Sequence, residues 1–229
     1  MKKSIKRTTL GKEIYHELRQ HILSGKASPG SRLIVANLAE MLELSATPVH
    51  EALSALEREG LAIYTPRRGY SVPKLSSENI EEIYVVREAF EVLMVRMAAE
   101  KASDKARQEL TDLVNAMENN VQRNDTTAFA ENDLAFHRAI WNSVENSLAE
   151  RIGEIIEGQF LLLIAILSRT EGRFNGALNE HKDIVAAINA NDATRAEAAM
   201  RTHIQRAKAS IILAQTSSPP KSQRSSAHR

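Results

Sequence analysis

The stretch SATPVHEALSALEREGL, residues 45–61, decides the fold of the N-terminal part of the chain. Ser45 is a residue type that favours helix N-caps, and Pro48 falls in the first helical turn, where its missing N–H is not needed. Apolar residues then recur at helical spacing as far as Glu59, and Gly60 ends the pattern. The stretch is therefore predicted to be a helix that begins at Ser45.

Short helices and β-like runs are predicted on both sides of this helix, and their order along the chain is informative. They are predicted as helices at residues 8–25 and 35–42 and as β-like runs at residues 61–65 and 70–72. A helix, a helix-turn-helix and then a hairpin is the order of a winged helix-turn-helix. In such units the second helix of the helix-turn-helix enters the major groove of DNA. Pro73 ends the unit, so residues 1–73 are predicted to form a DNA-binding domain.

The rest of the chain shows helical periodicity and no convincing strand. We expect about six helices, separated by capping and turn residues. They are predicted at residues 78–101, 104–122, 126–143, 146–168, 175–190 and 192–214. The fold class is therefore mostly α, with an all-α bundle over residues 78–214 as an effector and dimerisation domain. The tail, residues 215–229, has too few apolar residues to fold and is expected to be disordered.

Composition excludes several classes of protein. The chain has no cysteine, which excludes disulfides, thiolate metal sites and cysteine nucleophiles. Its longest apolar run covers residues 160–167, far short of the ~20 residues of a membrane-spanning helix. No apolar segment follows the basic N-terminus, so a signal peptide is not expected. The predicted location is the cytoplasm.

Charge is distributed unevenly along the chain. Residues 1–74 hold 12 Lys and Arg against 7 Asp and Glu, whereas residues 75–216 hold 15 against 22. A basic N-terminal part joined to an acidic larger part indicates a polyanionic partner for the former alone.

Five residues of the predicted DNA-binding domain are candidates for contact with nucleic acid. Ser45 and Thr47 lie at the start of the recognition helix, where hydroxyls and helix amides hydrogen-bond phosphate. His50, one turn further on, is placed to reach a base edge or a phosphate. Arg67 and Arg68 at the hairpin tip suit contact with phosphate or with the minor groove.

Four residues of the helical part suggest a metal site. Asp133 and His137 are four apart and share one helix face, while His181 and His203 lie on apolar faces of two other predicted helices. One carboxylate and three neutral imidazoles suit a first-row divalent metal, with zinc expected first and nickel or manganese as alternatives. Spacing alone leaves open whether the four converge or are separate structural residues of the core.

The N-terminal motifs, in order and spacing, resemble the DNA-binding domain of GntR-family bacterial regulators. The motifs are PGSRL at 29–33, LAE at 38–40, SATPVHEAL at 45–53, LEREGL at 56–61 and PRRGYSV at 66–72. The family usually has arginine at the positions held here by Ala46 and His50. This chain therefore lacks a bidentate guanine reader worth ~1–3 kcal/mol of discrimination.

The helical part carries a second resemblance. The motifs Asp133-x-x-Phe136-His137, Glu180-His181-x-x-Ile184 and Met200-x-x-His203-Ile204 resemble the metal motif of the FCD effector domain, found in the FadR branch of the GntR family. About six helices would place the chain in the shorter, VanR-like subgroup.

This resemblance implies a metal at the bottom of a pocket, where the metal holds a small organic acid through an oxygen. It also implies that Arg87 faces the pocket, where it would clamp a carboxylate. The alternative for Arg87 is a surface ion pair with Glu91, four residues on.

We therefore predict a homodimeric, ligand-responsive transcriptional regulator that binds operator DNA and a small-molecule effector of the carboxylate class. An enzyme is not expected, because the sequence has no HExxH motif, nucleophile elbow or phosphate-binding glycine loop. The remaining alternative is a constitutive dimeric repressor with neither metal nor effector.

Overall fold

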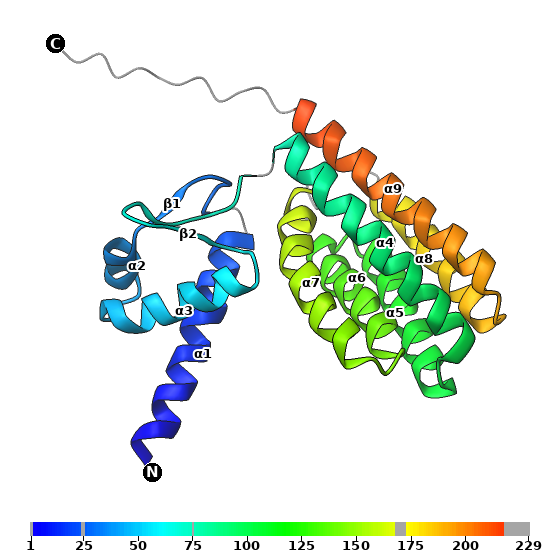
Figure 1. Ribbon diagram of the computed structural model, residues 1–229, viewed down its shortest axis with the longest axis horizontal. Coiled ribbons are helices and arrows are strands. Elements are labelled where there is room, and N and C mark those ends of the chain that lie inside the picture. The colour runs from blue at the N-terminus through cyan, green and yellow to red at the C-terminus, as the bar shows by residue number, and fades with distance from the viewer. Residues whose placement is uncertain (1, 24–25, 75, 168–172, 218–229) are drawn as a thin grey trace.

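The computed structural model describes residues 2–23, 26–74, 76–167 and 173–217. Residues 218–229 of the predicted tail lie outside the described residues, as does Gly25, the predicted end of the first helix. Residues 215–217 continue the last helix, so the prediction of disorder is wrong for them. The predicted fold class is confirmed, because the chain is mostly helical, with a small sheet in its N-terminal part (Figure 1).

The N-terminal part contains three helices and three short strands. They are α1 (Lys2–Leu23), β1 (Arg32–Leu33), α2 (Val35–Met41), α3 (Ala46–Arg58), β2 (Ile63–Thr65) and β3 (Gly69–Ser71). The antiparallel sheet has the order β1-β3-β2, with Tyr70 of β3 opposite both Leu33 and Tyr64. Sequence analysis missed β1, because a two-residue strand is defined only by its pairing with β3.

Helix α3 begins and ends as its sequence requires. Ser45 has the extended backbone of an N-cap residue, although its side chain makes no capping hydrogen bond. At the other end Gly60 has a φ of 74°, a left-handed conformation that glycine adopts without strain. Between these ends Val49 and Leu53 are fully buried, in the same apolar cluster as Leu18 of α1, the helix on which α3 packs.

Six helices form the C-terminal part within the described residues, in agreement with the sequence prediction. They are α4 (Ser77–Lys101), α5 (Asp104–Gln122), α6 (Thr126–Asn142), α7 (Ser147–Leu167), α8 (Arg173–Asn189) and α9 (Ala193–Ser217). Ser76, Ser103 and Asp125 cap α4, α5 and α6 by accepting hydrogen bonds from backbone amides three residues on. None of the described helices combines the length and the apolar character that a membrane crossing needs.

Helix packing builds one continuous apolar core in the bundle. Helix α4 runs along α9, while α5 packs on α6 and α8 (Figure 1). The inward faces of these helices contribute aliphatic and aromatic side chains, of which Trp141 and Phe136 are among the largest fully or almost fully buried.

The two parts are joined by direct packing as well as by the chain. Leu134 of α6 and Leu161 and Leu162 of α7 are buried in the same apolar cluster as the core of the winged helix. Gly158 of α7 lies so close to the end of α3 that an added Cβ would fall 1.4 Å from the carbonyl oxygen of Glu59. Backbone therefore meets backbone at this point, which only glycine permits.

We predict that Gly158→Ala destabilises the protein. Because a methyl group at Gly158 overlaps the Glu59 carbonyl, α7 must move away from α3, at an overpacking cost of ~1–3 kcal/mol. Thermal unfolding of the full chain measures the effect.

Gly11→Ala in α1 is the matched control. A Cβ at Gly11 meets no atom within 4 Å. The same substitution there is expected to stabilise by ~0.5–1 kcal/mol through helix propensity. Equal melting temperatures for the two variants would contradict close packing at Gly158.

Candidate metal centre and nucleic-acid interface

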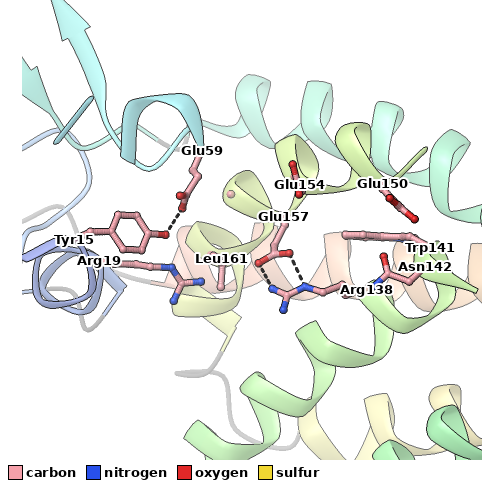
Figure 2. Close-up of a pocket in the computed structure, with 11 residues that line it drawn as sticks. Tyr15, Arg19, Glu59, Arg138, Trp141, Asn142, Glu150, Glu154, Glu157 and Leu161 are labelled. Carbon is pink, nitrogen blue, oxygen red and sulfur yellow. Dashed lines mark hydrogen bonds and ion pairs between the residues drawn. The ribbon is translucent and has the colours of Figure 1, made fainter. Parts of the chain in front are cut away.

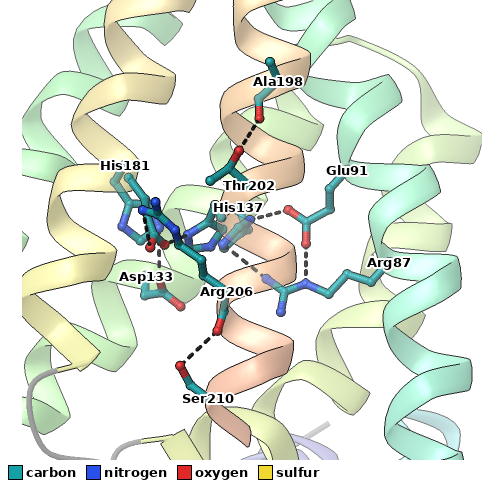
Figure 3. Close-up of polar contacts among 11 residues, drawn as sticks. Arg87, Glu91, Asp133, His137, His181, Ala198, Thr202, Arg206 and Ser210 are labelled. Atoms are coloured by element: carbon teal, nitrogen blue, oxygen red, sulfur yellow. Dashed lines mark hydrogen bonds and ion pairs between the residues drawn. The ribbon is translucent and has the colours of Figure 1, made fainter. Parts of the chain in front are cut away.

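The predicted metal ligands converge inside the bundle. Asp133 and His137 come from α6 and His181 from α8 (Figure 3). His203 comes from α9. One potential ligand atom from each lies within 4.8 Å of the others, and all four residues are buried. The separation is one that a single ion can bridge.

The site is assembled by helix periodicity and by apolar packing around it. The four-residue spacing puts Asp133 and His137 on the inward face of α6. The Phe136 ring packs edge-on against His181, with ring centroids 4.7 Å apart. The rings of His181 and His203 lie 4.5 Å apart, which brings α8 and α9 ligands together.

The donor chemistry fits a divalent metal. Oδ1 of Asp133 lies 3.0 Å from Nε2 of His181, yet neither ring nitrogen of His181 makes a hydrogen bond to the described residues. A buried nitrogen without a hydrogen bond costs free energy unless something coordinates it. A metal ion held by Asp133 and His181 would satisfy both groups.

The protonation states also suit coordination. Burial raises the pKa of Asp133, but the neighbouring His181, His137 and His203 outweigh burial and hold that pKa well below its usual range. Burial and the neighbouring imidazoles lower the pKa of His203 well below its ordinary value. At neutral pH Asp133 is therefore a carboxylate and His203 a neutral imidazole, the forms that bind metal.

Two buried carboxylates orient two of the histidines. Nδ1 of His203 lies 2.9 Å from Oε2 of Glu180, and Nδ1 of His137 contacts Oε2 of Glu91. Metal-bound histidines generally donate their second ring N–H to such a carboxylate. In both residues this arrangement leaves Nε2 as the coordinating nitrogen.

Arg87 lies beside this cluster, on α4. Its Nε is 2.5 Å from Oε1 of Glu91, and its Nη2 is 3.3 Å from Nε2 of His137 (Figure 3). The ion pair with Glu91 therefore exists, but both partners are about 1% exposed, so the alternative of a surface pair is wrong. The bundle buries this face of α4 against α6.

The buried pair keeps both of its charges. Burial raises the pKa of Glu91, but His137 and Arg87 outweigh it and lower that pKa to about 2. Burial lowers the pKa of Arg87, while Glu91 raises it, and the net shift is upward.

Sequence analysis did not assign the roles of Glu91 and Glu180. The sequence predicted for Glu91 only a possible surface ion pair with Arg87. It gave Glu180 only as part of the motif that contains His181. Glu91 is one helical turn after Arg87, and Glu180 directly precedes His181. This closeness to candidate site residues is a signal in the sequence, but only the burial seen in the structure distinguishes a carboxylate that orients a histidine from one that is solvated.

The candidate DNA contacts lie on the exposed side of the N-terminal part. Ser45, Thr47 and His50 are exposed along the first turns of α3. The His50 ring packs edge-on against Tyr70 of β3, with centroids 5.5 Å apart, so the helix and the hairpin form one surface.

The hairpin tip is held in place by hydrogen bonds. Arg67 has a φ of 65°, and the N–H of Arg68 donates to the Thr65 carbonyl at 3.0 Å. Nη2 of Arg32 donates to the Arg68 carbonyl at 2.6 Å. Both arginine side chains at the tip are exposed.

A cavity of about 830 Å³ lies beside the contact between the winged helix and helices α6 and α7 (Figure 2). On one wall the Tyr15 hydroxyl donates to Glu59 at 2.7 Å, and burial followed by this bond raises the pKa of Tyr15. On the other wall Nε of Arg138 donates to Glu157 at 3.0 Å. The cavity therefore lies between the end of α3 and helix α6, which carries Asp133 and His137.

Comparison with known families gives two matches. Residues 10–72 match the description "Bacterial regulatory proteins, gntR family", and residues 82–206 match "FCD domain". The second match alone covers more than half of the chain.

Individual relatives agree with these matches. The chain is 28% identical to the HTH-type transcriptional regulator McbR of Escherichia coli, over 60% of this chain and 62% of McbR, so less than two thirds of McbR is covered. It is 36% identical to an uncharacterized HTH-type transcriptional regulator of Agrobacterium vitis, over 55% of this chain and 75% of that protein.

A solved structure shows the same fold. The E. coli McbR/YncC structure matches with a TM-score of 0.76 at 22% identity, over 89% of this chain and 97% of that one. The named relatives are transcriptional regulators, which agrees with the expectation that the chain is not an enzyme.

Proposed function

Because the chain belongs to the gntR family of bacterial regulatory proteins, in the FadR-like branch with an FCD domain, we propose that it is a ligand-responsive transcriptional regulator. Its winged helix, residues 1–73, binds operator DNA, and its bundle, residues 78–214, binds a divalent metal and a small organic acid. The convergence of Asp133, His137, His181 and His203 carries this proposal. Six bundle helices favour the VanR-like subgroup, and the cytoplasm is the proposed location.

The four ligand residues are proposed to hold zinc, with nickel or manganese as alternatives. An ion held by these four residues would supply a positive charge that attracts an anionic oxygen of the effector. Asp133 supplies the only carboxylate of the set, and the neutral imidazoles add no charge. The site therefore keeps a net positive charge toward a carboxylate ligand.

Arg87 is proposed to fix the orientation of that ligand. A guanidinium has five N–H donors in a rigid fork, and the Nε–H of Arg87 is directed at Glu91. Its Nη2 lies 3.3 Å from His137, at the edge of the ligand cluster. A carboxylate next to the metal would lie within reach of this group.

Helix α6 is proposed to transmit binding to the DNA-binding part. Asp133 and His137 face the metal cluster, whereas Leu134 on the same helix is buried in the core shared with the winged helix. Arg138, the next residue after His137, pairs with Glu157 of α7, one residue before the Gly158 contact with α3. A ligand that moves α6 therefore changes the support of α3, with a typical coupling free energy of ~1–3 kcal/mol.

A homodimer is proposed from exposed apolar side chains on two neighbouring helices. Val86 and Leu93 of α4 are 59% and 51% exposed and are two turns apart. On α7, Leu148 and Ile155 are 57% and 62% exposed at the same seven-residue spacing. A second copy would bury both stripes and place two winged helices on a pseudo-palindromic operator.

We predict about one equivalent of divalent metal per chain in the purified protein, since four converging donors suit a single ion. Asp133→Ala/His137→Ala is expected to lose it, as measured by elemental analysis. The control His16→Ala/Asp183→Ala removes an exposed histidine and an exposed aspartate and should keep the metal. No metal in the wild type, even after zinc or nickel is supplied, would favour the constitutive dimeric repressor.

We predict that Arg67→Ala/Arg68→Ala weakens binding to any DNA duplex, because phosphate contacts do not depend on sequence. The slope of log affinity against log salt concentration should become shallower by about one for each phosphate that the variant no longer neutralises. Fluorescence anisotropy with a random-sequence duplex at several salt concentrations measures both. Lys105→Ala, an exposed cation at the start of α5, is the control. Unchanged affinity and slope would remove the hairpin from the interface.

We predict that Leu93→Glu/Ile155→Glu converts a dimer of this 25.4 kDa chain into a monomer, because two carboxylates would be buried at the proposed interface. Sedimentation velocity measures the change. Met41→Glu, at a side chain 50% exposed on α2, should stay dimeric. A wild type that sediments as a monomer would refute the dimer.

A further inference from the structure

Glu91 is the residue at which the metal ligands and Arg87 meet. It is fully buried on α4, and its two carboxylate oxygens take different donors. Oε1 accepts from Nε of Arg87 at 2.5 Å, and Oε2 contacts Nδ1 of His137 (Figure 3). One carboxylate thus joins the residue proposed to hold the effector to a residue proposed to hold the metal.

We propose that Glu91 is a positioning residue that fixes the tautomer of His137 and, with the same carboxylate, the place of Arg87. This inference rests on the proposed metal function and adds to it the group that makes His137 able to coordinate. Glu91 itself is not among the four ligands.

The number of protons on each partner determines the tautomer of His137. A neutral imidazole has one N–H, so a His137 whose Nδ1–H donates to Glu91 keeps a lone pair on Nε2. The Nη2 group of Arg87, 3.3 Å from that Nε2, can only donate and is compatible with the same tautomer. The contacts of His137 with Glu91 and with Arg87 therefore both favour the tautomer that binds a metal through Nε2.

A carboxylate is required because both of its partners are donors. Glutamine has the same size but offers one carbonyl oxygen and one NH2 group. In Glu91→Gln the charged guanidinium of Arg87 takes the oxygen, because charge-assisted hydrogen bonds are the stronger ones. The NH2 group then faces Nδ1 of His137, which must accept, and the proton moves to Nε2, where it blocks coordination.

The first measurement is zinc affinity of the full-length protein, by competition with a chromophoric chelator after the metal has been removed. Glu91→Gln is expected to bind zinc about 10- to 100-fold more weakly than the wild type. Glu100→Gln, the same substitution at an exposed position on α4 where Glu100 pairs with Arg96, should leave the affinity unchanged.

The second measurement separates positioning from a general structural role. In Arg87→Met/Glu91→Gln no guanidinium competes for the glutamine oxygen, which can then accept from His137. The double variant should recover most of the zinc affinity that Glu91→Gln loses. A purely structural role of the ion pair predicts that the double variant binds no better than the single one.

The third measurement reads the tautomer directly in metal-free protein, by long-range ¹H–¹⁵N correlation spectra of His137. The wild type and the double variant should carry the proton on Nδ1, and Glu91→Gln should carry it on Nε2. If Glu91→Gln does not fold, the tautomer in the double variant decides, and a proton on Nε2 there overturns the proposal.

Two further outcomes also overturn it. One is an unchanged zinc affinity in Glu91→Gln, and the other is a double variant that binds no better than the single. If the wild type binds no zinc, the proposed metal function fails, while the tautomer spectra still test the role of Glu91.

Discussion

Burial of charge is the constraint on which the bundle depends. Asp133, Glu91, Glu180 and Arg87 all lie in its interior, where an isolated charge would cost several kcal/mol. Each of them faces a partner of complementary charge or hydrogen-bonding type. The helices must therefore hold these groups in register, since the loss of one partner leaves the other buried and uncompensated.

Metal coordination is a natural use of such an interior. The apolar core provides the scaffold, and in the proposed site Glu91 and Glu180, which contact Nδ1 of His137 and His203, would leave Nε2 of each ring for coordination. Nε2 of His181 faces Asp133 at 3.0 Å but makes no hydrogen bond within the described residues, so an ion in the proposed site would stabilise this buried imidazole. The low dielectric of this interior makes it costly to bury a charged group. It also strengthens the attraction between a buried charged group and a ligand of opposite charge.

The proposed coupling between the buried site and the DNA-binding surface depends on the position of α6. One face of this helix carries Asp133 and His137, and another carries Leu134, which is part of the core of the winged helix. Close packing at Gly158 leaves little room for compensating movement, because interiors are dense and transmit small shifts. At the DNA surface the chain lacks arginine at Ala46 and His50, so the hairpin and the helix N-terminus carry much of the proposed contact.

The sequence by itself determined the winged helix, the six bundle helices and the pairing of Asp133 with His137 on one face, because periodicity, caps and turns are local properties. It also indicated His181 and His203 as candidates. Tertiary structure alone decided that these two meet the α6 ligands, since convergence depends on how α8 and α9 pack against α6. Packing also decided that Glu91 and Arg87 are buried together. Their four-residue spacing could not predict this, because it is the same for a pair at the surface and for a pair in the core.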